Sequence, residues 1–136
     1  MKKDIPIKKV EELAVAVAPR MSYEDDNDMF WDVFLLNLRG EEIKDVLVNS
    51  KGYGEIDGEE VKTSQFRFYF EKIDANTAIP VEQIKTDMFN LTNEYWISFS
   101  YDGYMYDKKY IFVKGSLDKM NLTNVPYIGK KGVMIR

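Results

Sequence analysis

The sequence contains no histidine and no cysteine among its 136 residues. Histidine is the most frequent general base near neutral pH and the commonest ligand of transition metals, so its absence excludes histidine-dependent nucleophile sites and ordinary zinc hydrolase sites. The absence of cysteine excludes disulfides and thiolate metal sites, and it fits a reducing compartment. We therefore expect no catalytic residues of these classes, no metal site and no cofactor.

The sequence also lacks long apolar runs and nucleotide-binding motifs. No segment approaches the ~20 apolar residues that a membrane span needs, and the N-terminus has no apolar core of a signal peptide. The segment Gly52-Tyr53-Gly54 lacks the third glycine of a dinucleotide fingerprint. We expect a cytoplasmic protein without membrane association.

The net charge of −4 and the pI near 5.0 argue against nucleic-acid binding, because polyanions attract basic surfaces. Basic residues gather only at the ends of the chain, at 2–3, 8–9, 130–131 and 136. RNA association would need these ends to meet, and it remains the third functional hypothesis.

Composition predicts one folded β-rich domain. The hydrophobic fraction of 45% and the charged fraction of 31% are those of an ordinary globular protein. Aromatic residues make up 14% of the chain, and their large flat side chains favour strands. A chain of this length folds by default as a single domain.

Alternating apolar residues and turn signals predict about seven short strands. The run 10–18 has Leu13, Val15 and Val17 on one parity and is expected to be a strand. The strand expected at 65–73 places three phenylalanines on one face, which we expect to be core. The segments 22–28 and 51–60 are expected to be loops, the second because of its three glycines, and 121–136 is expected to be loop with a short strand at 133–135. The remaining expected strands are 30–36, 43–50, 78–84, 95–101 and 104–113. Together they predict an all-β fold: an antiparallel immunoglobulin-like β-sandwich in a single domain.

The clearest local prediction is a hairpin closed by Asp102-Gly103, a pair that readily adopts the positive φ angles of a two-residue turn. The resulting register pairs Tyr101 with Tyr104, and one face then carries Tyr95, Phe99, Tyr101, Tyr104, Tyr106 and Tyr110. The opposite face carries Trp96 and Met105. If the tyrosine face is exposed it is a candidate interface, and if it is buried it is core.

Carboxylate chemistry is the second functional hypothesis. Acidic residues are plentiful at 24–28 and 55–60, and a glycosidase needs two carboxylates that face each other across a cleft. Such an enzyme, or a carbohydrate-binding module, would use these loops with Trp31 or Tyr53. The simpler interpretation of both loops is solvated charge.

Three segments carry a resemblance to a known group of proteins: Trp31 to Leu38, Val46 to Gly54, and Asn93 to Phe99. They resemble small uncharacterised bacterial proteins, some of which are labelled by transfer as a phenylalanyl-tRNA synthetase subunit. The resemblance implies a stand-alone β-sandwich and no catalytic residue. The label itself is not supported, because the chain is too short for the catalytic domain of such a synthetase.

These observations favour a non-catalytic binding or interaction module. We expect it to contact a protein partner through a sheet edge or through the hairpin face from Tyr95 to Tyr110. The candidate interaction residues are Tyr53, Tyr101, Tyr104 and Tyr106. The sequence names neither the partner nor the oligomeric state.

Overall fold

A computed structural model describes residues 7–8, 10–20 and 29–136. Almost all regular structure in it is β. The elements in chain order are β1 (Ile7–Lys8), β2 (Leu13–Pro19), β3 (Phe30–Asn37), β4 (Ile43–Ile56), β5 (Glu59–Lys62), β6 (Phe66–Ile73), β7 (Thr77–Lys85), the 3-10 helix η1 (Thr86–Asn90), β8 (Thr92–Tyr101), β9 (Tyr104–Phe112), the 3-10 helix η2 (Lys119–Asn121), β10 (Thr123–Asn124) and β11 (Lys131–Ile135).

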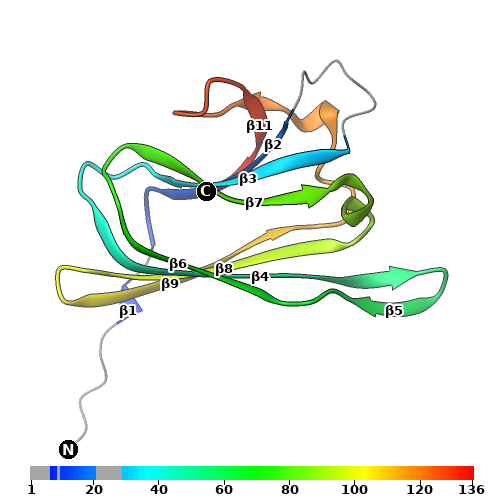
Figure 1. Cartoon of the computed structure of the whole chain (residues 1–136), viewed down its shortest axis with the longest axis horizontal. Helices are drawn as coiled ribbons and strands as arrows, with labels where there is room; N and C mark the ends of the chain where they lie inside the picture. The colour runs from blue at the N-terminus through cyan, green and yellow to red at the C-terminus, as the bar shows by residue number, and fades with distance from the viewer. Residues whose placement is uncertain (1–6, 9, 21–28) are drawn as a thin grey trace, which may run out of the picture.

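The strands form two sheets that pack face to face (Figure 1). The first, which we name the β4 sheet, has the order β1-β9-β8-β4, and both β5 and β6 pair with the other edge of β4. The second, the β3 sheet, has the order β10-β11-β2-β3-β7. All pairings are antiparallel except that of β1 with β9. The predicted all-β sandwich is therefore confirmed.

The described residues form eleven strands, more than the seven or so that the sequence predicts. Seven of the longer ones lie where strands are predicted: β2, β3, β4, β6, β7, β8 and β9. Their order, with β9-β8-β4-β6 in one sheet and β2-β3-β7 in the other, corresponds to that of immunoglobulin-like sandwiches. The register of the late hairpin is also confirmed, since Tyr101 pairs with Tyr104 and Tyr95 with Tyr110.

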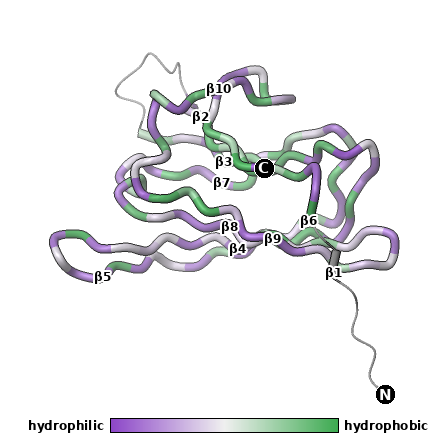
Figure 2. The backbone as a smooth tube through the Cα atoms, turned by 180° about the vertical axis from the view of Figure 1, so that it is seen from behind, coloured by the Kyte–Doolittle hydropathy of each residue, from purple (hydrophilic) through white to green (hydrophobic). Residues whose placement is uncertain are grey.

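The prediction of a loop at 51–60 is wrong. Strand β4 continues to Ile56, and β5 returns alongside it after a turn at Asp57-Gly58. Both turn residues have positive φ, 53° and 81°, as a tight two-residue hairpin turn requires. Figures 1 and 2 show this hairpin extending beyond the β3 sheet.

The main core lies between the two sheets. Val33 and Leu35 of β3 face Ile97 and Phe99 of β8, and all four are buried. The hydroxyl of Tyr110 donates a hydrogen bond of 3.1 Å to the carbonyl of Leu13, which ties the β4 sheet to the β3 sheet through polar atoms.

The phenylalanine face of β6 is core only in part. Phe68 and Phe70 are half-buried against the core, whereas Phe66 is 54% exposed. The strand β6 lies at the edge of its sheet, so Phe66, its first residue, has a strand neighbour on one side only. The prediction is therefore wrong for Phe66.

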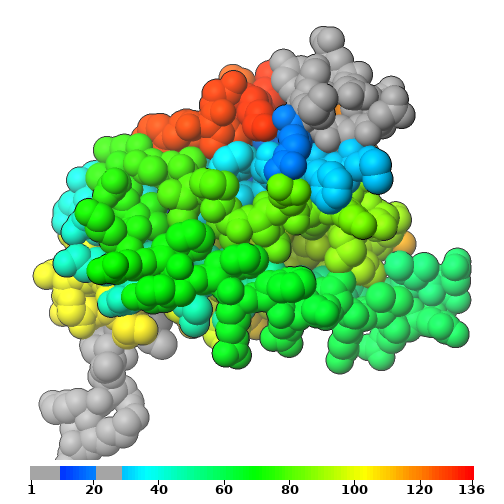
Figure 3. Space-filling view, viewed as in Figure 1, coloured from blue at the N-terminus to red at the C-terminus, as the bar shows by residue number. Residues whose placement is uncertain are grey.

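The C-terminal segment covers the outer face of the β3 sheet. A second buried cluster joins Ala14, Ala16 and Leu36 to Val125, and Figure 3 shows the last residues (red) lying over the β2 and β3 region. The small alanines of β2 leave room for this segment to approach closely. The segment 121–136 is mostly loop in the prediction from sequence, whereas in the structure it contains β10 and β11 and covers part of the β3 sheet.

The acidic loop at 22–28 lies outside the described residues. Within the described part of the chain, no helix has the length and apolarity needed to span a membrane.

Candidate functional site

The outer face of the β4 sheet carries large apolar side chains that point to solvent. In an antiparallel sandwich the outward residues of a strand are normally polar. Here Trp96 is 41% exposed, and the exposed side chains of Tyr69, Met105 and Ile111 lie on the same face. We name this surface the open face and define it by Leu47, Tyr53, Tyr69, Trp96, Met105 and Ile111.

Polar and charged groups are interleaved with these side chains. The ammonium of Lys109 lies 4.8 Å from the centre of the Trp96 ring, and Arg67 Nε donates a hydrogen bond of 3.1 Å to Asn49 Oδ1. A small hollow of about 110 Å³ beside Trp96 is lined by Asn49, Trp96, Ser98 and Asp107. Tryptophan, tyrosine, methionine and arginine are the residues enriched in protein interfaces.

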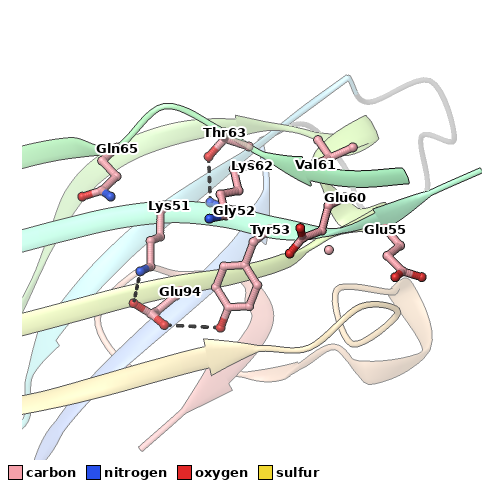
Figure 4. A pocket seen from close by; sticks show the side chains of 11 residues that line it. Lys51, Gly52, Tyr53, Glu55, Glu60, Val61, Lys62, Thr63, Gln65 and Glu94 are labelled. Carbon is pink, nitrogen blue, oxygen red and sulfur yellow. Dashed lines mark hydrogen bonds and ion pairs between the residues drawn. The ribbon is translucent and has the colours of Figure 1, made fainter. Parts of the chain in front are cut away.

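One end of the open face contains a nearly buried carboxylate, that of Glu94 on β8 (Figure 4). Glu94 is 6% exposed, although its side chain points away from the core. The hydroxyl of Tyr53 donates a hydrogen bond of 3.3 Å to Glu94 Oε1, and Lys51 Nζ lies 3.7 Å from Oε2. Burial and the neighbouring Glu94 charge raise the pKa of the Tyr53 hydroxyl, so Tyr53 is a neutral donor at physiological pH.

Tyr53, Lys51 and Glu94 line a pocket of about 470 Å³ under the β4–β5 hairpin. Its wall is fixed by Thr63, whose Oγ1 accepts a 2.7 Å hydrogen bond from the amide of Gly52. A Cβ at position 52 would lie 3.0 Å from Thr63 Cγ2, so glycine permits this close approach.

Two carboxylates of the predicted acidic segment 55–60 reach the same pocket. Glu55 and Glu60 line it and are exposed on the hairpin. In the described ranges, no three histidine, cysteine, aspartate or glutamate residues are grouped so that they could hold a metal ion. Glu94 already has Lys51 and Tyr53 as partners, so the polar groups at the base of this pocket are paired within the protein.

The predicted tyrosine face is core. Tyr95, Phe99 and Tyr110 are buried, and Tyr106 is only 8% exposed with its ring stacked on Phe99 at a centroid distance of 4.9 Å. The inward face of the hairpin is the one that the β3 sheet covers, and it contributes Tyr95, Phe99 and Tyr110 to the core between the sheets. Tyr106 therefore offers a partner almost no surface, which corrects its assignment as an interaction residue.

Tyr101 and Tyr104 lie half-buried at the tip of the same hairpin. The Tyr101 hydroxyl donates to the Glu41 carboxylate, and the guanidinium of Arg39 lies 4.4 Å from the centre of its ring. The structure thus engages Tyr101 with the β3–β4 connection. Of the four predicted interaction residues, Tyr53 is the one on the open face.

Trp31, proposed for carbohydrate contact, is also a core residue. It is 3% exposed and packs edge-on against Phe89 with ring centroids 5.0 Å apart. The carbohydrate hypothesis therefore retains Tyr53 but loses Trp31.

The residues that sequence analysis passed over are Trp96, Tyr69 and Arg67. Strand alternation already places Trp96 opposite to the tyrosines of its hairpin. The alternation does not predict which of the two faces of this hairpin the second sheet covers.

Comparison with known proteins adds no family. A scan against protein-family models gives no match, and a search of curated proteins also gives none. The functional argument therefore depends on the geometry of the chain.

Proposed function

We propose that the protein is a non-catalytic module that binds a protein partner through the open face, with Trp96 as the central anchor. The observation that carries this proposal is the difference between the two outer faces of the sandwich. The chain's own C-terminal segment covers the β3 sheet, whereas Trp96, Tyr69, Met105 and Ile111 remain exposed on the β4 sheet. Exposed apolar patches of this kind typically mark interaction sites.

The charges on the open face indicate the chemistry of the partner. Lys109 and Arg67 bring two positive charges to the face and Asp107 one negative charge, while Glu94 is paired with Lys51. A face that mixes charges of both signs around apolar side chains favours apolar contact and hydrogen bonding over a strongly charged partner. We therefore propose a partner surface with an apolar centre and a polar rim, and a side chain that enters the hollow beside Trp96.

A photo-crosslinking phenylalanine analogue at Ser98, in the centre of the open face, tests the proposal. We expect one protein to be crosslinked from this position and its yield to fall at least tenfold on Trp96→Ala, since central tryptophans at interfaces contribute about 2–4 kcal/mol. The matched control is Met120→Ala, which removes an exposed apolar side chain elsewhere.

The proposal fails if the crosslinked protein is captured equally well by Trp96→Ala, or equally well with the analogue at Tyr127, which is exposed outside the open face. A crosslinked product of twice the chain mass would identify a second copy of the chain as the occupant. Light scattering on the purified protein would then show a dimer that Trp96→Ala dissociates.

Carbohydrate binding is a second candidate, and the pocket at Tyr53 favours it. An aromatic ring beside the paired Glu94 and Lys51 would give a saccharide one apolar surface and several hydrogen-bonding groups. A glycan array would detect this activity. Binding that survives Tyr53→Ala would place any sugar site elsewhere.

A further inference from the structure

A third cavity lies between the two sheets where β6 begins and β7 ends, and it shares Lys51, Gly52 and Thr63 with the pocket at Tyr53. Its volume is about 340 Å³. This is within the range of small-molecule sites, which starts near 300 Å³. The residues that line it include Ser50, Phe66, Glu82, Ile84, Met88 and Tyr95.

The carboxylate of Glu82 enters this cavity from the edge strand β7. Glu82 pairs with Val33, which is fully buried, so both side chains point between the sheets. The register shifts between Val33 and Phe34, where β7 has one extra residue, Val81. Because of this shift, even-numbered residues of β7 point inward on the Glu82 side and odd-numbered residues point inward on the other side. The charged Glu82 therefore points inward between Ile79 and Ile84, which pair with the buried Leu35 and Trp31.

Among the residues that the structure describes, the hydrogen-bond partners of the Glu82 carboxylate are two neutral hydroxyls. The Tyr95 hydroxyl donates a 2.7 Å hydrogen bond to Oε2, and Ser50 Oγ lies 3.5 Å from Oε1. Within the described ranges, no ion pair links Glu82 to a lysine or arginine. Lys51 and Lys85 also line the cavity, but the ammonium of Lys51 is paired with Glu94.

This arrangement leaves the carboxylate undersatisfied. An ionised carboxylate offers about four acceptor sites, and two hydroxyls use at most two of them. Partial burial of a negative charge costs free energy, because the carboxylate loses water molecules that would hydrate it. A cation bound at the carboxylate offsets this cost. The apolar side chains of Phe66, Ile84 and Met88 line the same cavity as the Glu82 carboxylate, and they could pack against a hydrocarbon chain.

We propose that this cavity binds a primary alkylammonium group, with the ammonium on the Glu82 carboxylate and the alkyl chain against Phe66, Ile84 and Met88. The same chemistry belongs to a free aliphatic amine and to the side chain of a lysine in a peptide. This site is independent of the open face, and either can fail without the other.

The test is a titration of the ¹⁵N-labelled protein with butylammonium chloride, with 1-butanol as the neutral isostere and sodium chloride to hold ionic strength constant. We expect saturable shifts at the amides of Ser50 and Glu82 with butylammonium only. Glu82→Gln should weaken binding at least tenfold. The control Glu71→Gln removes an exposed carboxylate of β6 and should bind as the wild type does.

Equal responses to butylammonium and butanol would overturn the proposal, as would undiminished binding by Glu82→Gln. A second measurement on the wild type does not depend on the variant's folding. Saturating butylammonium should lower the pKa of Glu82, which is measured from the ¹³C chemical shift of its carboxyl carbon as a function of pH. An unchanged pKa would contradict the proposed binding site.

A parallel titration with a short lysine peptide blocked at both termini identifies the source of the amine. Tighter binding of the peptide supports a protein lysine, and tighter binding of butylammonium supports a free amine. Failure of both ligands overturns the proposal.

Discussion

The hydroxyl of Tyr95 on β8 donates a 2.7 Å hydrogen bond to the carboxylate of Glu82 on β7, and this contact joins the two sheets. Burial of Tyr95, together with the Glu82 charge, raises the pKa of the phenol well above its ordinary value. Tyr95 therefore stays neutral and remains a donor throughout the physiological range.

The first prediction is a pH dependence of stability that comes from Glu82. Burial raises its pKa above the ordinary value of 4.5, and hydrogen bonds from Tyr95 and Ser50 offset part of this increase. The folded state thus holds the proton more tightly than the unfolded state, so the stability from protonated Glu82 is present below pH 4.5 and is lost as pH rises through the raised pKa. We expect the stability of Glu82→Gln relative to the wild type to increase over this window.

Urea unfolding at a series of pH values, from below 4.5 to neutrality, measures this difference. Glu71→Gln serves as the control for loss of one carboxylate. Parallel stability curves for Glu82→Gln and the wild type would contradict the prediction.

The second prediction separates core tyrosines from those of the open face. Tyr106→Ala removes a ring that is buried and stacked on Phe99, and we expect a loss of about 3–5 kcal/mol in the free energy of unfolding. Tyr69→Ala, on the open face, should leave it nearly unchanged. Chemical denaturation of both variants measures their free energies of unfolding. A Tyr106→Ala variant as stable as the wild type would mean that the hairpin face is not core.

The third prediction concerns the C-terminal segment on the β3 sheet. A Cβ at Gly132 would lie 2.9 Å from the backbone oxygen of Val17, closer than atoms can pack. Gly132→Ala should therefore shift β11 and cost about 1–3 kcal/mol. Gly40→Ala is the matched control, because a Cβ there has nothing within 4 Å. Equal stability of the two variants would show that β11 does not pack closely on β2.

The fourth prediction concerns Asn37, whose amide is fully buried at the end of β3. Its Nδ2 donates to the carbonyls of Glu41 at 2.9 Å and Asp74 at 3.1 Å, and its Oδ1 accepts from the amide of Arg39 at 3.0 Å. The side chain ties the β3–β4 connection to the β6–β7 turn, and Asn37→Ala leaves these backbone groups without a partner.

We expect Asn37→Ala to cost about 1–3 kcal/mol, the penalty for unsatisfied buried polar groups. Asn121→Ala removes a 2.9 Å hydrogen bond to the Ser116 carbonyl at an exposed site and should cost less. Thermal and urea unfolding of the pair provides the comparison. If both variants lose the same stability, burial is not what makes Asn37 important.

The turn at Asp57-Gly58 has the same dipeptide as the turn at Asp102-Gly103, and both pairs adopt positive φ. The flanking residues differ: aromatic and β-branched residues flank Asp102-Gly103 and predict strands, whereas glycines and glutamates flank Asp57-Gly58. Those residues have low strand propensity, and pairing of β4 with β5 overrides it.

The sequence by itself determined most of the longer strands and the register of the late hairpin, because alternation of period two and a two-residue turn are local properties of the chain. It also determined that Trp96 and Tyr106 lie on opposite faces. Only the tertiary structure decided which face is buried, since that depends on where the β3 sheet packs. The same holds for Glu82, whose inward position follows from the irregular pairing of β3 with β7, a contact between segments far apart in the chain.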